Sequence, residues 1–310
     1  MVKKKEFKGL VSDAELRLLR IYRKVVECGG FSAAEVELNI SRAAISIAMS
    51  DLETRLGLRL CQRGRSGFSL TEEGRQVYEY SLQLLSSLES FRTQVNALHD
   101  RLKGELNIGI TDTLVTMPHM QITNALAQLK EQGPDVTINI RMIPPNEIEL
   151  AVLDGRLHIG VIPTLRPLAG LEYLPLYEEQ SRLYCSQNHP LFEQTNLSAD
   201  TIEQQDAVVP AYAQTAETKA IHARLNGTAT ATDREGVAFL ILTGKYIGYL
   251  PDHFADLWVI DGRMKPLVPE QYQYTTQFSA ITRKGGRANL VLETYLEALV
   301  DAIKIHDVNG

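Results

Sequence analysis

A long segment with a heptad pattern divides this chain into a small head and a large body. From Val77 to Leu102, apolar residues recur at alternating spacings of four and three, and Ser81 interrupts the series. The segment contains neither proline nor glycine and extends over about 26 residues. Such a repeat places an apolar stripe along a continuous helix and is typical of helices that pair. The sequence therefore predicts a linker helix between two folded parts of the chain.

Length and charge agree with this division. At about 100–200 residues a domain, 310 residues correspond to two or three domains. Residues 1–104 hold 17 Lys and Arg against 13 Asp and Glu, a net charge of +4, whereas residues 105–310 hold 15 against 25, a net charge of −10. This asymmetry is expected when only the head binds the phosphates of a nucleic acid, although chance variation in surface charge is the alternative. We predict a head over 1–71, a linker helix over 72–104 and a body over 105–310.

Composition and motifs argue against several classes of protein. The chain has no apolar run near the ~18 residues that span a bilayer and no apolar signal at its start, so we expect a cytoplasmic protein without membrane association. Its three cysteines are widely spaced, which disfavours a disulfide framework or a cysteine zinc site. The histidines form no metal-binding pair, and no phosphate-binding loop, nucleophile elbow or dinucleotide motif is present. We therefore predict no cofactor, no metal and no enzymatic activity, although residues distant in sequence can still assemble a catalytic site.

The head has the pattern of a helix-turn-helix. Apolar residues at helical spacing predict helices over 13–28, 33–38 and 42–56. Ser32 and Ser41 stand before the second and third helices as N-caps. Two short helices joined by a tight turn form this motif.

The third of these helices has an unusual outward face. At 100° per residue, Ile45 marks a buried stripe, and the opposite face is small, uncharged and rich in hydroxyls. Serines can bond base edges in a DNA major groove, and an aliphatic side chain can meet a thymine methyl. Packing against another protein surface is the alternative. The outward residues are Ala43, Ser46, Ile47, Ser50 and Thr54, with Arg42 on the flank.

A basic hairpin is predicted after the third helix. Residues 58–71 contain three arginines and two glycines between short apolar stretches. Arg63 and Arg65 lie near its tip, where they suit contacts with phosphates or a minor groove. A solvated charged turn is the alternative interpretation.

The head resembles the winged helix-turn-helix of LysR-type transcriptional regulators. The matching residues are Phe31-Ser-Ala-Ala, Leu38-Asn-Ile-Ser, Ala44-Ile-Ser, Leu52-Glu53, Leu56-Gly57, Leu60, Arg63 and Leu70-Thr71-x(2)-Gly74. Length and the order of a head followed by an acidic body also match, so the resemblance extends over the whole chain. Arg42-Ala43 and Ile47 depart from the residues usual in the family, which affects the base preference rather than the binding mode. Cys61 replaces a usual Phe and is expected to keep an apolar packing role.

The resemblance implies a regulator that binds double-stranded DNA at a dyad-symmetric site, as a homodimer or a tetramer. It also implies RNA polymerase and a small-molecule co-inducer as partners. The predicted DNA-binding residues are Ser32, Ser41, Arg42, Ala43, Ser46, Ile47, Ser50, Arg63 and Arg65. The predicted dimerisation residues on the linker helix are Leu84, Leu88, Phe91, Val95 and Leu98. Burial of that helix face against its own domain is the alternative.

The body alternates strands and helices. Strands are expected over 105–110, 136–142, 157–162, 182–186 and 274–282, and helices over 118–129, 147–153 and 290–305. The strand–helix alternation predicts a parallel sheet, and the return of the chain predicts two lobes. The fold class is therefore α+β overall, with an effector domain similar to periplasmic binding proteins, lobe I over about 105–178 and 272–310 and lobe II over about 179–271. His158, where the family usually has Asp, is interpreted as a structural partner rather than a catalytic base.

The loop after the first strand of the body is the predicted ligand site. In α/β sheets, ligands bind where strands end and helices begin. Free backbone N–H groups and two hydroxyls favour a carboxylate or phosphate, although the charge of Asp112 opposes an anion and such threonines often serve as helix caps. The predicted effector-binding residues are Thr111, Asp112 and Thr113 in this loop and, from the ends of other strands, Thr164, Pro210 and Tyr249.

Two other functions are compatible with parts of the pattern. A solute-binding protein of a transport system would explain the body, but it needs an export signal and has no use for the head. An adaptor protein would use the head for docking, and its binding would lack the steep salt dependence of DNA binding. The whole pattern favours a ligand-responsive transcription factor, and it leaves the effector, the operator and the direction of regulation open.

Overall fold

The structure, a computed structural model, describes residues 11–64, 67–97, 102–118, 121–285 and 289–309. Only the backbone is described for residues 63–64, 67, 90, 96–97 and 305–309. The chain forms two compact units, Met1–Phe91 and Arg92–Gly310, each of which has its own architecture. Within the described ranges, no helix is long and apolar enough to cross a membrane.

The first unit is a winged helix-turn-helix, as predicted. Its elements are α1 (Asp13–Glu27), α2 (Phe31–Leu38), α3 (Arg42–Leu56), β1 (Cys61–Gly64), β2 (Gly67–Leu70) and the first part of α4 (Glu72–Ala97). Strands β1 and β2 pair antiparallel and form the wing. Tyr22, Ile45 and Met49 are completely buried where the helices meet, because their periodicity places them on inward faces.

The helix caps differ in one place from the sequence prediction. Helix α2 begins at Phe31, and its N-cap is Gly30, whose φ of +148° lies in a region that favours glycine. Ser32 is therefore an exposed residue inside the helix, and its predicted capping role is wrong. Ser41 caps α3 as predicted, because its Oγ accepts a hydrogen bond of 3.2 Å from the Ala44 N–H.

The long helix α4 begins against the wing. The Thr71 Oγ1 accepts a hydrogen bond from the Gly74 N–H at 2.9 Å and caps the helix. A Cβ at Gly74 would lie 1.9 Å from the carbonyl oxygen of Leu60, so only glycine permits this close approach. Leu82 and Leu85 are buried, so one side of α4 is covered along its first turns.

The far end of α4 corrects a predicted boundary. The described helix ends at Ala97, and strand β3 (Lys103–Ile110) already contains Gly104, so the helix does not extend to Gly104 as expected. Leu102, assigned to the heptad stripe by its spacing, packs against the hydrophobic core of the second unit. Periodicity alone could not show that Leu102 packs against the core of the second unit rather than against another helix.

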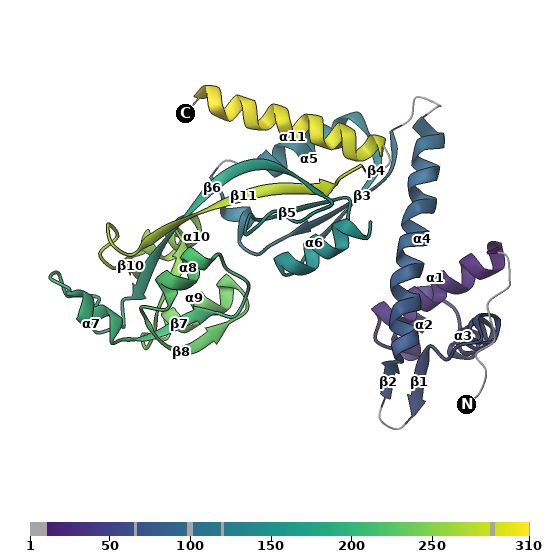
Figure 1. Cartoon of the computed structure of the whole chain (residues 1–310), viewed down its shortest axis with the longest axis horizontal. Helices are drawn as coiled ribbons and strands as arrows, with labels where there is room; N and C mark the ends of the chain where they lie inside the picture. Colours follow the sequence, from purple (N-terminus) through teal and green to yellow (C-terminus); the bar gives the residue numbers. More distant parts are fainter. Residues whose placement is uncertain (1–10, 65–66, 98–101, 119–120, 286–288, 310) are drawn as a thin grey trace. The chain divides into compact units, whose positions relative to one another are not determined.

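The second unit is built on one mixed sheet of nine strands (Figure 1). Eight strands follow the order β4-β3-β5-β11-β6-β9-β7-β8, and β10 pairs with β6. The remaining strand bounds are β4 (Asp135–Met142), β5 (Ile159–Pro163), β6 (Leu171–Ser186), β7 (Asp206–Pro210), β8 (Asn226–Ala231), β9 (Ile247–Pro251), β10 (Met264–Pro266) and β11 (Gln273–Arg283). The helices are η1 (Leu114–Thr116), α5 (Gln121–Gln132), α6 (Pro145–Leu153), α7 (Ala199–Glu203), α8 (Ala216–His222), α9 (Arg234–Leu242), α10 (Asp252–Val259) and α11 (Leu290–Asn309).

Two long strands connect the lobes of this unit. β6 and β11 pair antiparallel over most of their lengths, and Figure 1 shows them passing from one lobe to the other. Strands β3, β4 and β5 are parallel to one another, as predicted, and so are β7, β8 and β9. The sheet as a whole is mixed, because β5 and β9 meet the long strands antiparallel. Strand β6 also begins at Leu171, earlier than the expected start at residue 182.

Candidate DNA-binding face and ligand site

Helix α3 presents the outward face that its sequence predicts. Ile45 and Met49 are completely buried, whereas Ile47 on the opposite side is 71% exposed. An isoleucine this exposed has no packing role in its own domain and is free to contact another molecule. Among the predicted contacts, Ser32, Ser41, Arg42, Ala43 and Ser50 are exposed and Ser46 is half-buried.

An ion pair fixes α3 against α1. The Arg55 Nη1 lies 2.5 Å from the Glu15 Oε1, and the same carboxylate accepts hydrogen bonds from the hydroxyl and the N–H of Ser12. The bonds from Ser12, followed by the one from Arg55, lower the pKa of Glu15 to about 2. Glu15 therefore stays ionised at neutral pH and holds α3 against α1 through Arg55.

The wing has the predicted hairpin backbone. Arg63 lies in β1 opposite Phe68, but its side chain is outside the described residues. Arg65 lies entirely outside them. Their predicted phosphate contacts accordingly stay predictions.

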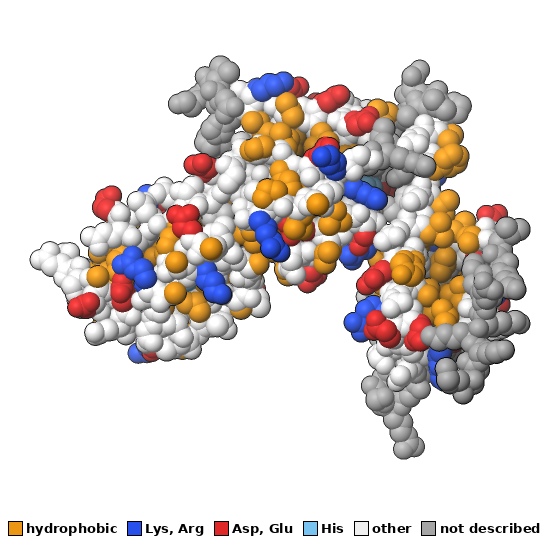
Figure 2. Space-filling view, in the orientation of Figure 1, with side chains coloured by type: hydrophobic (Ala, Val, Ile, Leu, Met, Phe, Trp, Pro, Cys, Tyr) orange, Lys and Arg blue, Asp and Glu red, His pale blue; other side chains and the backbone are white. Residues whose placement is uncertain are grey.

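The exposed side of α4 carries an apolar face. Tyr80, Phe91 and Val95 are exposed, with Phe91 at 66%, and they fall within about 60° of one another at 100° per residue. Leu88 is half-buried, and the half-buried Leu84 packs partly against the core of the head. Figure 2 shows hydrophobic side chains along the visible side of this helix. Tyr80 was missed in the sequence because it lies outside the strict heptad positions, and the predicted Leu98 lies outside the described residues.

In the second unit, charged side chains from both lobes converge on Arg234, the first residue of α9. Its Nη1 lies 3.0 Å from Asp112 Oδ1 and its Nη2 3.0 Å from Glu179 Oε1. Its backbone N–H donates to Asp112 Oδ2 at 2.5 Å, so Asp112 occupies the N-terminus of α9. We name Asp112, Glu179, Arg234, His253 and Thr116 the interlobe cluster.

His253 extends this cluster towards η1. Its Nε2 lies 3.1 Å from Glu179 Oε2, and its Nδ1 lies 2.6 Å from Thr116 Oγ1. Asp112 and Thr116 follow β3 in lobe I, whereas Arg234 is the first residue of α9 and His253 the second residue of α10, both in lobe II. The interlobe cluster therefore bonds the two lobes directly to each other.

Burial makes these contacts energetically important. The side chain of Glu179 is 1% exposed and that of Arg234 is 11% exposed. Burial by itself would lower the pKa of the Arg234 guanidinium, but the neighbouring charges, with Glu179 the strongest, raise it above its ordinary value. Burial raises the pKa values of Tyr212 and Tyr274 beside it, so both phenols stay neutral hydrogen-bonding groups.

The predicted ligand loop lies directly beside the interlobe cluster. Thr111 and Thr113 flank Asp112, both are buried, and neither Oγ1 atom has a hydrogen-bond partner among the described residues. Thr113 also adopts a φ of +64°, an uncommon and strained conformation for a β-branched residue. Strain and unsatisfied hydroxyls at one place are typical of a binding site.

Other parts of the prediction for this loop differ from the structure. The helix expected near Pro118 begins at Gln121, and the three-residue 3₁₀ helix η1 precedes it. The charge of Asp112 is compensated by Arg234, so Asp112 does not stand alone at the site.

The three remaining predicted effector residues lie in separate environments. Thr164 follows β5, and its Oγ1 lies 2.7 Å from the Ser279 Oγ. Pro210 ends β7, and its carbonyl oxygen accepts a bond of 3.3 Å from Gln214, whose own Oε1 is buried without a partner among the described atoms. Tyr249 lies within the core of lobe II, where its ring contacts His222 and Tyr274.

Sequence reasoning missed Arg234, Glu179 and His253. Arg234 is the first residue of α9, after β8, and His253 is the second residue of α10, after β9. The strand-end rule gave Pro210 and Tyr249 in lobe II, and it missed these two because it was not carried on to the starts of the helices that follow. Glu179 offers only the weaker signal of a charged residue inside a strand.

His158 has the structural role that its sequence context suggests. Its Nδ1 accepts a hydrogen bond of 3.1 Å from the Asn107 N–H in β3. Burial lowers its pKa to about 4, so the ring is neutral at neutral pH. Among the described residues, no group of three His, Cys, Asp or Glu side chains is arranged to hold a metal ion.

Two family models together cover nearly the whole chain. Residues 16–75 match the bacterial regulatory helix-turn-helix protein, lysR family, and residues 99–304 match the LysR substrate binding domain. A winged helix-turn-helix joined by a helix to such a domain defines a DNA-binding regulator with an effector-binding domain. The chain belongs to the LysR family of transcriptional regulators.

Individual relatives agree with this assignment. The chain is 58% identical over 293 residues to the HTH-type transcriptional activator BauR of Pseudomonas aeruginosa, which covers 94% of this chain and 96% of that protein. Full-length CbnR complexed with its target DNA has a similar fold, with a TM-score of 0.67 and 20% identity over 93% of this chain and 99% of that one. A full-length OxyR variant from Pseudomonas aeruginosa has a TM-score of 0.61 and 17% identity, covering 96% of each chain.

Proposed function

We propose that this regulator binds a dyad-symmetric DNA site as a homodimer and responds to a small anionic effector at the interlobe cluster. The exposed face of α3 is the observation that carries the DNA-binding part. Short side chains around Ile47 permit close approach to base edges, and Arg42 at the start of the helix is exposed for a phosphate or a guanine. The exposed stripe of α4 supports the homodimer, because two copies would bury Phe91 and Val95 against each other.

DNA contacts are tested by affinity as a function of salt and sequence. On a mixed-sequence duplex, Arg63→Ala should flatten the slope of log affinity against log salt by about one unit. On a set of DNA sites selected in vitro with the wild type, Ile47→Ser and Ser46→Ala should change the order of the sites by affinity. Arg283→Ala, an exposed arginine at the end of β11, is the control. Unchanged slopes and rankings in correctly folded head variants would exclude these residues from the interface.

The ligand part of the proposal depends on Thr111, Thr113 and Asp112. An acidic effector would bond the two unpartnered hydroxyls and compete with the Asp112 carboxylate for Arg234 and for the N–H of α9. Asp112 thus holds the place of an anion in the structure described. Displacing it would break a bond between the lobes, which gives the effector a route to change their arrangement.

A thermal-shift screen of carboxylate and phosphate metabolites tests this site. Thr113→Val removes an unsatisfied buried hydroxyl while keeping the shape, so the ligand-free protein should be as stable as the wild type or more stable. Added at a hundred times its dissociation constant, an effector should stabilise the wild type by about 2.7 kcal/mol and Thr113→Val by less. Equal stabilisation of both proteins would exclude Thr113 from the site, and a cationic or uncharged effector would refute the anion proposal.

Several expectations from the sequence complete the proposal. From the family resemblance and the composition we infer contact with RNA polymerase, a cytoplasmic location and assembly as a dimer or a tetramer. The same reasoning predicts that the protein has no resident cofactor and no catalytic activity. Chromatin mapping of bound sites and turnover assays on the full chain test these expectations.

A further inference from the structure

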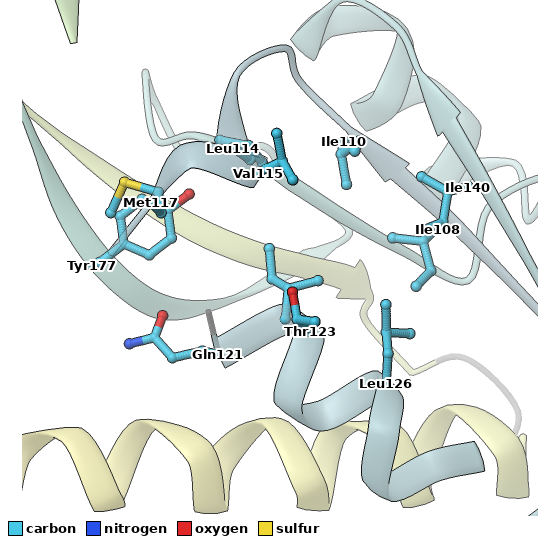
Figure 3. Close-up of a pocket in the computed structure, with 11 residues that line it drawn as sticks. Ile108, Ile110, Leu114, Val115, Met117, Gln121, Thr123, Leu126, Ile140 and Tyr177 are labelled. Carbon is cyan, nitrogen blue, oxygen red and sulfur yellow. The ribbon is translucent and has the colours of Figure 1, made fainter. Parts of the chain in front are cut away.

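A separate apolar pocket lies in lobe I, under η1. It has a volume of about 140 Å³ and is formed by β3, β4, η1, α5 and one residue of β6 (Figure 3). None of the residues of the interlobe cluster is among those that line it. Its apolar walls come from Ile108, Ile110, Leu114, Ile122, Leu126 and Ile140.

Two polar side chains at this pocket have buried atoms without hydrogen-bond partners among the described residues. Gln121, at the start of α5, is 6% exposed, and its Oε1 is unpartnered. The hydroxyl of Tyr177 is also buried and unpartnered. Figure 3 shows the carbonyl oxygen of Gln121 on the side of Tyr177, with the Tyr177 hydroxyl directed towards Leu114. A buried amide oxygen without a partner costs about 1–3 kcal/mol, which a bound donor would recover.

The pocket defines the chemistry of its occupant. Its volume is close to that of an engineered apolar cavity of about 150 Å³ that binds benzene, so a single ring fits. The Oε1 of Gln121 only accepts hydrogen bonds, so the occupant must supply a hydroxyl or an N–H. A charged ligand would lose its hydration without gaining an opposite charge, because none of the described residues that line the pocket is charged.

We propose that this pocket is a second small-molecule site, for an uncharged compound of about one ring that carries one hydroxyl or N–H. The ring packs against the isoleucine and leucine side chains. Its donor bonds the Oε1 of Gln121, and Tyr177, whose hydroxyl is buried without a partner among the described residues, lines the same pocket. This site is independent of the proposed effector at the interlobe cluster.

Phenol and toluene are suitable probes, because they share a ring and differ in the donor. Their binding to the full-length protein is measured by isothermal titration and ligand-observed NMR. Phenol should saturate the wild type with a dissociation constant of about 1 mM or tighter. Ile122→Phe, which places a ring in the pocket, should weaken both probes at least tenfold, whereas the matched control Leu150→Phe on the exposed side of α6 should leave them unchanged.

A second variant tests the hydrogen bond and does not depend on the folding of the first. Gln121→Leu keeps the size of the side chain and removes the acceptor, so the preference for phenol relative to toluene should fall by about two- to twelvefold, the equivalent of one hydrogen bond of 0.5–1.5 kcal/mol. Toluene should bind this variant at least as tightly as it binds the wild type. The proposal is overturned if phenol binding to the wild type does not saturate. It is also overturned if Ile122→Phe binds the two probes as tightly as the wild type does, or if Gln121→Leu keeps the wild-type preference for phenol relative to toluene. The DNA affinity and the anion response of the variants are separate readouts, so failure here leaves the proposed function standing.

Discussion

Replacing Arg234 with methionine should destabilise the effector domain far more than replacing an exposed arginine in a similar pair. Arg234→Met keeps most of the apolar stem but leaves the carboxylate of Glu179, which is 1% exposed, without its guanidinium. Removing one partner of a buried ion pair costs about 3–5 kcal/mol, because the remaining charge stays desolvated. Arg224→Met is the control, since Arg224 is 49% exposed and pairs with Glu203 at 2.7 Å. Exposed pairs contribute about 0–1 kcal/mol.

The single tryptophan of the chain provides the assay. Trp258 lies in α10 of the second unit, edge-on to Phe254 with ring centroids 5.0 Å apart, so its fluorescence follows unfolding of this unit alone. Urea titrations at equal protein concentration give the free energy of unfolding, and a loss of 3–5 kcal/mol corresponds to about 6–20 °C in melting temperature for a domain of this size.

A double variant separates this explanation from simple loss of packing. Arg234→Met with Glu179→Gln removes both charges and keeps an amide that can bond His253, so it should be more stable than Arg234→Met alone. The reasoning is refuted if Arg234→Met loses no more than Arg224→Met. It is equally refuted if the second substitution adds a further loss.

Three further predictions concern other parts of the chain. Phe91→Lys with Val95→Lys should convert dimers to monomers in sedimentation, since charges replace the apolar face of α4. The control Glu79→Lys, about 120° away from Phe91 on the same helix, should leave the dimer intact. A dimer that persists in the double variant would place the contact elsewhere. The folded-state pKa of His158, about 4, lies below its ordinary value of 6.5, so between these pH values the unfolded chain binds more protons than the folded one. The free energy of unfolding should therefore fall by about 3 kcal/mol as the pH decreases from 6.5 to 4. Urea titrations should show a flatter profile for His158→Gln, and an unchanged profile would assign the pH dependence to other groups. Gly74→Ala should destabilise the head by about 1–3 kcal/mol or more in thermal denaturation followed by circular dichroism, because the added methyl meets a backbone carbonyl; wild-type stability would show that the wing can move away.

The sequence by itself determined the parts of this protein whose signals are local. The outward face of α3 follows from the helical period around Ile45, because a buried stripe on one side fixes what the other side exposes. Ser41 was recognisable as a cap, since a cap bonds backbone groups within three residues. The alternation of strands and helices and the return of the chain predicted the two-lobed domain, because each strand and helix has its own local periodicity.

The tertiary structure alone decided which distant groups meet. Arg234 contacts Asp112 and Glu179, which lie 122 and 55 positions away along the chain, and only the antiparallel pairing of β6 with β11 brings the lobes to this arrangement. Similarly, the heptad pattern could not tell that Leu102 packs into the effector domain. Periodicity records that a residue is buried, whereas the identity of its partner depends on how the strands and helices pack, and the charges of the interlobe cluster carry no periodic signal at all.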